Sequence, residues 1–256
     1  MGITLSKFRK DKGAGFDATS QYLYTLTGKA KVYDREQENL ALRHNIVREI
    51  FNSNLLSPIH SELKSGGLRV LDVGPKNVDF VTANVIDGLP FGDNSFDFVY
   101  VRNMAYDIQE SQWSSLIKEC TRVLKPGGYI EITEAELRAL NCGPLLKKLS
   151  KKFFDYILST KVNLLISEKI EEILKSTNKY HDIIDHHQRP FALGCWPTHL
   201  KDAYRTYSLD VFRSVIKFSD VKEKDYDQTV QKLMSEANSY RTHFFIHKYL
   251  TQKIVA

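Results

Sequence analysis

The sequence has 256 residues, of which 42% are hydrophobic and 26% charged, so it is long enough to fold as a soluble globular unit. The net charge is only +5 and the basic residues are scattered, so we expect no nucleic-acid partner. No apolar run reaches the ~18–20 residues of a membrane-spanning helix. Three cysteines without a close pair indicate a reducing compartment, so we expect a cytoplasmic protein.

Residues 1–20 are polar and basic, which predicts a flexible tail before a single domain over residues 21–256. Gly2 and Ser6 fit the M-G-x-x-x-[ST] pattern for N-myristoylation. Lys7, Arg9 and Lys10 would supply the second, basic signal that one acyl chain needs for stable membrane binding. Gly2 is therefore a candidate lipidation site, and its acylation would bring the protein to a membrane surface.

The middle of the chain predicts alternating helices and strands. Within residues 35–55, Leu42, Ile46 and Ile50 fall four apart, as on one face of a helix. Buried strands are predicted at 68–73, 96–101 and 128–133, and an amphipathic helix with Ser111 as its N-cap at 111–124. This order predicts a βαβ arrangement in which the three strands are parallel neighbours in chain order.

Beyond about residue 140 the pattern is mainly helical, with helices expected over 145–158, 163–176 and 222–254. The last helix would place His243 and His247 one turn apart, a spacing that can bind a metal ion. No third ligand accompanies them, so we expect no metal site.

Three segments match the motifs of one family in their residues and in their order along the chain: VLDVG at 70–74, NVIDGLPFGDNSFDFVYVRN at 84–103 and ECTRVLKPGGYIEI at 119–132. Together they resemble class I S-adenosylmethionine-dependent methyltransferases, and EQENLALRH at 36–44 is similar to a helix of fungal, small-molecule members. The resemblance implies an α/β, Rossmann-like, mostly parallel sheet with its core over 68–136 and a helical acceptor side over 137–256. It also implies S-adenosyl-L-methionine as cofactor and a small molecule as methyl acceptor.

The same resemblance implies site residues at the carboxyl ends of the strands, where ligands of such sheets lie. The residues that correspond to the cofactor site are Asp72, Gly74, Asn84, Val85, Arg102 and Asn103. The candidates for the acceptor side are Tyr106, Glu134 and Trp196. The sequence identifies no catalytic acid or base.

The segment after Gly74 departs from the family, which continues with a glycine-rich turn, a helix and a second strand ending in a ribose-binding acid. This chain reaches Val78–Val81 after only three residues. A parallel neighbour needs a crossover of about a dozen residues, so we expect this strand to pair antiparallel or to leave a disordered edge. The sheet is thus incomplete at its first βαβ unit. An impaired, methyltransferase-like binding module is the alternative function, and a dehydrogenase-like nucleotide binder is weaker because no GxGxxG is present.

Overall fold

The computed structural model describes residues 3–7, 42–73, 79–83, 88–136, 138–180 and 185–255. Four of the predicted site residues, Gly2, Gly74, Asn84 and Val85, lie outside these described residues. Within the described ranges, no helix is long and apolar enough to span a membrane.

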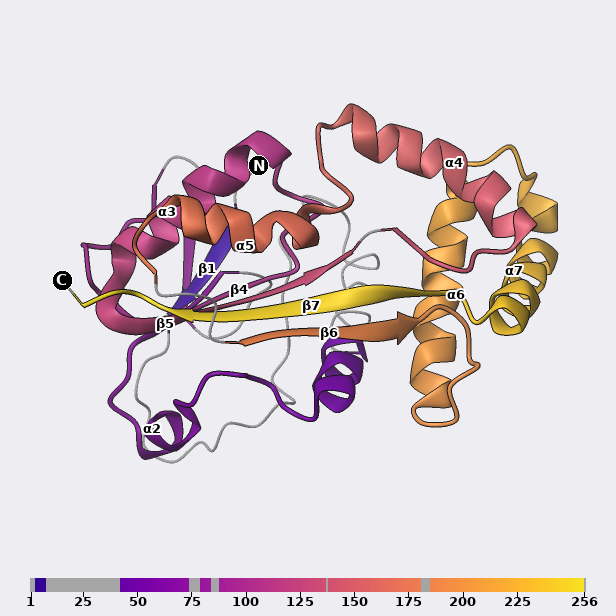
Figure 1. Ribbon diagram of the computed structural model, residues 1–256. Coiled ribbons are helices and arrows are strands. Elements are labelled where there is room, and N and C mark those ends of the chain that lie inside the picture. The colour runs from indigo at the N-terminus through magenta and orange to yellow at the C-terminus, as the bar shows by residue number, and fades with distance from the viewer. Residues whose placement is uncertain are drawn as a thin grey trace.

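A seven-stranded sheet forms the centre of the protein, in the order β3-β1-β2-β4-β5-β7-β6 (Figure 1). The strands are β1 Ile3–Lys7, β2 Val70–Val73, β3 Asp79–Ala83, β4 Phe96–Arg102, β5 Leu124–Ala135, β6 Asp185–Ala192 and β7 His243–Gln252. β2, β4 and β5 are parallel neighbours, which confirms the predicted order of the three strands. Only β1 and β7 run antiparallel to their neighbours, so the other five strands share one direction and the α/β, mostly parallel class is confirmed.

The N-terminal strand β1 lies between β2 and β3 and is antiparallel to both. Leu5 is paired with Val73 on one side and with Val81 on the other. The prediction of a flexible tail is therefore wrong for Ile3–Lys7, because these residues complete the backbone hydrogen bonding of an otherwise open edge of β2. The strand after the shortened connection does not pair with β2 at all, in line with the expectation that it could not be its parallel neighbour.

Helices cover both faces of the sheet, with α3 and α5 on one face and α2 on the other (Figure 1). Their bounds are 42–51, α2 His60–Ser65, α3 Trp113–Val123, α4 Pro144–Ser159, α5 Ile166–Ser176, α6 Lys201–Lys217 and α7 Tyr226–Tyr240. The predicted apolar stripe of α3, from Trp113 to Cys120, is completely buried. Ser111 is not its N-cap, because a 3₁₀ turn over Glu110–Gln112 precedes the helix and is capped by Gln109.

The Pro-Gly-Gly turn near the start of β5 requires its glycines. Gly127 has a positive φ of 76°, which costs other residues energy. A Cβ on Gly128 would lie 2.8 Å from the carbonyl oxygen of Asp97 and 2.9 Å from that of Lys125. The turn can therefore approach β4 closely only without a side chain at residue 128.

The C-terminal part differs from its prediction at one element. The expected helices at 145–158 and 163–176 are present as α4 and α5, but the one at 222–254 ends at Tyr240 and is followed by β7. β7 is paired along its whole length with β5 and β6, and this pairing outweighs the local helical pattern. His243 and His247 therefore lie on a strand, and the described residues contain no group of three or more potential metal ligands.

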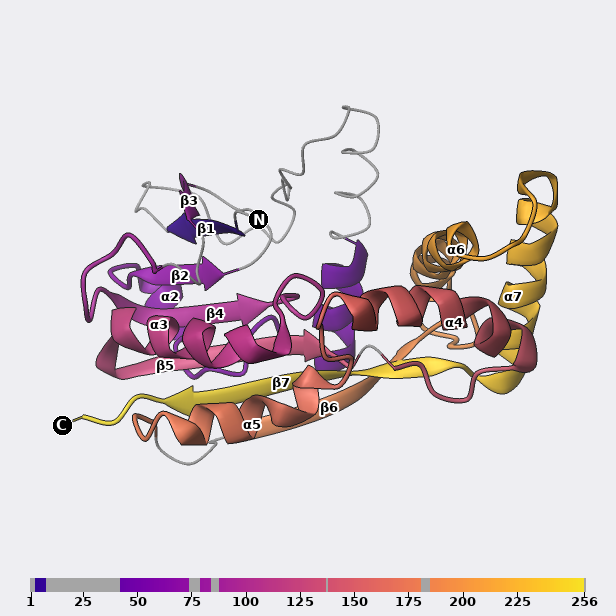
Figure 2. The same cartoon turned by 90° about the horizontal axis from the view of Figure 1, so that it is seen from above.

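The helices α4, α6 and α7 gather at the end of the sheet toward which β4 and β5 point (Figure 2). The segment that follows the helix at 42–51 is tied to the sheet by Lys248 on β7 and Glu131 on β5, a buried ion pair whose side chains are at most 1% exposed. The Lys248 ammonium donates to the carbonyls of Ser53 and Asn54, and Glu131 Oε2 accepts from the N–H of Leu56. These contacts fix the helix near the carboxyl ends of the strands.

Candidate functional site

Two of the predicted cofactor residues form a buried ion pair. Asp72 lies on β2 and Arg102 ends the neighbouring strand β4, so both side chains reach the same end of the sheet. Arg102 Nη2 donates to Asp72 Oδ2 at 2.7 Å, and Arg102 Nε donates to Oδ1 at 3.2 Å. The two side chains are only 7% and 10% exposed, so this fork-like pair is shielded from bulk water.

His44 extends this pair toward the helix at 42–51. Its Nδ1 lies 3.4 Å from Arg102 Nη1. Burial, reinforced by the charge of Arg102, lowers the pKa of His44 to about 4. The imidazole is thus neutral at pH 7, and the site contains one carboxylate, one guanidinium and one uncharged ring.

Asn103 follows Arg102 directly and turns the chain away from the sheet. Its φ is 56°, in the left-handed region that asparagine tolerates better than most residues. Its backbone N–H donates to the carbonyl of Thr133 on β5 at 3.1 Å. The predicted Arg102–Asn103 site thus lies where β4 ends beside β5.

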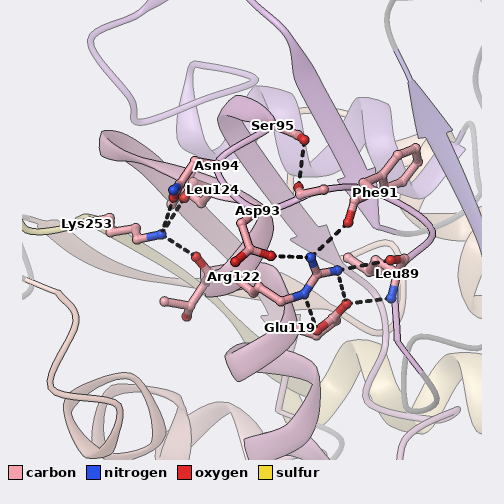
Figure 3. A network of polar contacts seen from close by, with 11 residues as sticks. Leu89, Phe91, Asp93, Asn94, Ser95, Glu119, Arg122, Leu124 and Lys253 are labelled. Atoms are coloured by element: carbon pink, nitrogen blue, oxygen red, sulfur yellow. Dashed lines mark hydrogen bonds and ion pairs between the residues drawn. The ribbon is translucent and has the colours of Figure 1, made fainter.

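The loop before β4, which the resemblance assigns to the adenine pocket, is anchored to α3 by Arg122 (Figure 3). The guanidinium donates to the carbonyls of Leu89 and Phe91 and to the carboxylate of Asp93, at 2.7–3.0 Å. It also donates to Glu119, whose Oε1 accepts the N–H of Leu89. One side chain therefore organises the backbone over residues 89–93.

Lys253 anchors the second half of this loop (Figure 3). Its ammonium donates to Asn94 Oδ1 at 3.0 Å and to the carbonyls of Thr121 and Leu124 at the end of α3. The C-terminal segment thereby joins the loop, the helix and the sheet. The loop is thus held at the amino end of β4, where Ser95 precedes the strand.

Glu134 has a different position from the one expected for an acceptor residue. It is 1% exposed, and its carboxylate accepts the N–H groups of Met104 and Ala105 at 2.7 and 3.1 Å. Burial raises its pKa to about 7, against the opposing effects of these N–H groups and of the Arg43 charge. Glu134 fixes the turn after β4, and it does not line the neighbouring pocket.

That pocket lies beyond the carboxyl ends of β4 and β5, under the helices α4 and α6. The space inside it that a water molecule can enter is about 80 Å³. Tyr106, Ala135 and Glu136 reach it from the strand ends, and Arg43 reaches it from the helix at 42–51. The remaining wall is mainly apolar and aromatic, formed by Leu146, Phe153, Phe154, Leu193, Tyr207, Val211, Val215 and Phe244 among others.

Of the predicted acceptor residues, the pocket includes only Tyr106, which is 46% exposed. Trp196 lies outside the lining, and its indole N–H donates to the carbonyl of Thr242 at 3.0 Å. Sequence reasoning missed Arg43 and Glu136. Arg43 directly precedes His44, and Glu136 lies two positions after Glu134. No motif or spacing in the sequence marks either residue as part of a site.

Comparison with known proteins gives a consistent family. Residues 11–132 match a family model described as a methyltransferase domain. A demethylmenaquinone methyltransferase of Staphylococcus epidermidis is 30% identical over 109 residues, which are 42% of this chain and 43% of that protein. The corresponding enzyme of Bacillus pumilus is 32% identical over 84 residues, 33% of this chain and 32% of that protein. The chain thus spans less than half the length of these relatives.

Solved structures give weaker similarity. The phosphoethanolamine N-methyltransferase 2 of Haemonchus contortus, in complex with phosphomonomethylethanolamine and S-adenosylhomocysteine, has a TM-score of 0.39 and 21% identity, over 70% of this chain and 37% of that chain. A methyltransferase-like protein from Bacillus halodurans has a TM-score of 0.37 and 14% identity, over 70% of this chain and 73% of that one.

Proposed function

Because residues 11–132 belong to the methyltransferase domain family, we propose that the chain transfers the methyl group of S-adenosylmethionine to a small-molecule acceptor. The observation that carries the proposal beyond the family match is the buried Asp72–Arg102 pair at the carboxyl ends of two parallel strands. Ligands of such sheets bind at this end.

The residues present fit one part of the cofactor. Its amino-acid end carries an ammonium and a carboxylate, which are complementary to Asp72 and Arg102 respectively. Among the residues that the structure describes, no acid takes the place of the one that would hold the ribose, since β1 lies in the sheet position of the strand that should carry it. We therefore expect the cofactor to be held mainly by its amino-acid end.

The acceptor side of the proposal rests on the pocket. S-adenosylmethionine supplies an activated methyl group, so the chain needs mainly to align an acceptor and exclude water. The apolar walls from α4 and α6 suit both tasks, and the pocket opens beside the strand ends at Tyr106 and Glu136. The buried Asp72–Arg102 pair and the apolar pocket favour methyl transfer over a non-catalytic binding module.

Saturation-transfer NMR with S-adenosylmethionine tests the proposal. In the full chain, protein magnetisation should reach the methionine and adenine protons of the ligand. The double variant Asp72→Asn/Arg102→Gln removes both charges without leaving one of them buried and unpaired, and it should lower binding at least about tenfold. Lys118→Gln, on the exposed side of α3, is the matched control. Equal signals in the folded double variant and the unaltered chain would show that Asp72 and Arg102 do not bind the cofactor.

A further inference from the structure

Three side chains that can donate hydrogen bonds line the pocket. They are Arg43 on the helix at 42–51, Tyr106 in the turn after β4 and Tyr207 on α6. The guanidinium and the two hydroxyl groups make no hydrogen bond or ion pair with the residues that the structure describes. We call these three residues the donor cluster.

The polar ends of the donor cluster lie close to one another. Burial around its hydroxyl group raises the pKa of Tyr106, Tyr207 raises it further, and the charge of Arg43 opposes the rise. Such effects act mainly over short distances, so both neighbours lie near the Tyr106 hydroxyl. Arg43 is half-buried with its Nε inside, so a ligand would meet the guanidinium at its terminal amino groups.

The two carboxylates nearest to the donor cluster are held by other groups. Glu136 Oε1 accepts from the guanidinium of Arg138. Both oxygens of Glu134 accept backbone N–H groups from the turn after β4. Neither carboxylate forms an ion pair with Arg43, so the charge of this guanidinium is available to a ligand.

A carboxylate matches this set of donors. It only accepts hydrogen bonds, its two oxygens offer about four acceptor positions, and its geometry suits a guanidinium. A phosphate group would bring a charge of about −1.5 to −2 to a single cation among apolar walls, where an unpaired charge is costly. The pocket therefore suits a ligand with one negative charge.

The walls of the pocket indicate what carries the carboxylate. Phe153, Phe154 and Phe244 present aromatic side chains to it, and flat rings pack well against such walls. The space that a water molecule can enter is small, which favours a single ring over a fused ring system.

We propose that the pocket binds a small aromatic carboxylate, and that Arg43 is the specificity-determining residue that pairs with it, assisted by the hydroxyl groups of Tyr106 and Tyr207. This inference rests on the proposed function for its role, since the bound compound is the methyl acceptor. Its test uses the pocket without cofactor, so a failure of S-adenosylmethionine binding and a failure of this proposal give different results.

The test compares 4-fluorobenzoate with 4-fluorobenzamide, which has nearly the same shape but no charge. Dissociation constants are measured by fluorine NMR titration of the full chain without cofactor. A charge-assisted contact with Arg43 predicts that the carboxylate binds about tenfold more tightly than the amide. Arg43→Gln should reduce this preference to about threefold or less, because the hydroxyl groups remain but the charge is lost.

Three further variants complete the design. Tyr207→Phe keeps the ring and removes one donor, so the preference should fall to about fourfold. Arg48→Gln, on the same helix but outside the pocket lining and 37% exposed, should leave the preference unchanged. Val211→Trp should fill the pocket and weaken both compounds.

Equal binding of the two compounds by the unaltered chain would overturn the proposal, and this comparison needs no variant. A full preference in folded Arg43→Gln, or an equal loss in Arg48→Gln, would also overturn it, because the net positive charge of the chain would then explain the result. Binding unaffected by Val211→Trp would place the compounds outside the pocket.

Discussion

Burial of His247 makes stability depend on pH at the scale of a single residue. Its pKa is lowered from 6.5 to about 4 by burial, with a further contribution from His186. Between these values the unfolded chain binds a proton that the native state does not. The contribution of His247 to stability is therefore fully present above pH 6.5 and is lost as pH falls toward 4. The contribution is up to ~3 kcal/mol.

We therefore expect His247→Gln to make the rise in unfolding free energy between pH 4 and 6.5 less steep, as measured by urea denaturation at several pH values, while the similarly buried His44 keeps its share. His199→Gln, whose side chain is 74% exposed, is the control and should retain the full slope. An unchanged slope in His247→Gln would mean that this ring is protonated in the native state at pH 5.

The candidate site could be predicted from sequence where a residue follows a strand directly. The position of Arg102 at the end of β4 could be predicted in this way, because strand ends converge at one edge of a parallel sheet, and Asp72 came from the VLDVG motif on β2. Their mutual pairing could not be predicted, since it depends on the register of β2 against β4. Arg43, Glu136 and the aromatic walls of the pocket come from elements far apart in sequence, and only tertiary packing brings them together.

At the scale of elements, the loop before β4 depends on Arg122. Replacing this residue by Met removes donors to the carbonyls of Leu89 and Phe91 and to two carboxylates. The side chain is 33% exposed, so we expect solvent to reduce the loss to ~1–2 kcal/mol. Hydrogen exchange of the amides at 88–95 should accelerate, whereas Lys118→Met on the same helix should change neither quantity. Unaltered protection in Arg122→Met would show that the loop is ordered by other contacts.

The strand β1 gives a second prediction for an element. Deleting residues 1–8 removes the backbone partner of Leu71 and Val73. Because each lost hydrogen bond contributes ~0.5–1.5 kcal/mol, unfolding free energy should fall by ~2–4 kcal/mol and the β2 amides should exchange faster. The variant Arg9→Gln/Lys10→Gln, which keeps the strand, is the control. Unchanged exchange of β2 in the deleted chain would contradict the sheet order.

Some helices and strands could be predicted from the sequence and others could not. The α3–β5 unit was predictable, because its apolar stripe and its Pro-Gly-Gly turn are local signals. β1 was not, because a short strand inserted far from its neighbours in sequence leaves no local pattern. β7 was taken for the end of a helix, since its short apolar segment follows α7 closely and its partners β5 and β6 are distant in the chain.

At the scale of the whole molecule, the sheet keeps the expected parallel strands β2, β4 and β5, and β1 occupies the position beside β2. The Asp72–Arg102 pair and the pocket lie at the carboxyl ends of the strands, while β1 stands where the ribose-binding strand would lie. Losing the ribose contacts, at roughly 1.5–3 kcal/mol for each charge-assisted hydrogen bond, should weaken a micromolar complex to about millimolar.

Calorimetric titration of the full chain with S-adenosylmethionine tests this central claim most directly. The predicted result is saturable binding with a dissociation constant of about 1 mM, reduced below detection in Asp72→Asn/Arg102→Gln. Absence of saturable binding at concentrations well above ~10 mM would contradict the proposed function. Micromolar binding would instead contradict the inference that β1 leaves the ribose without its acidic partner.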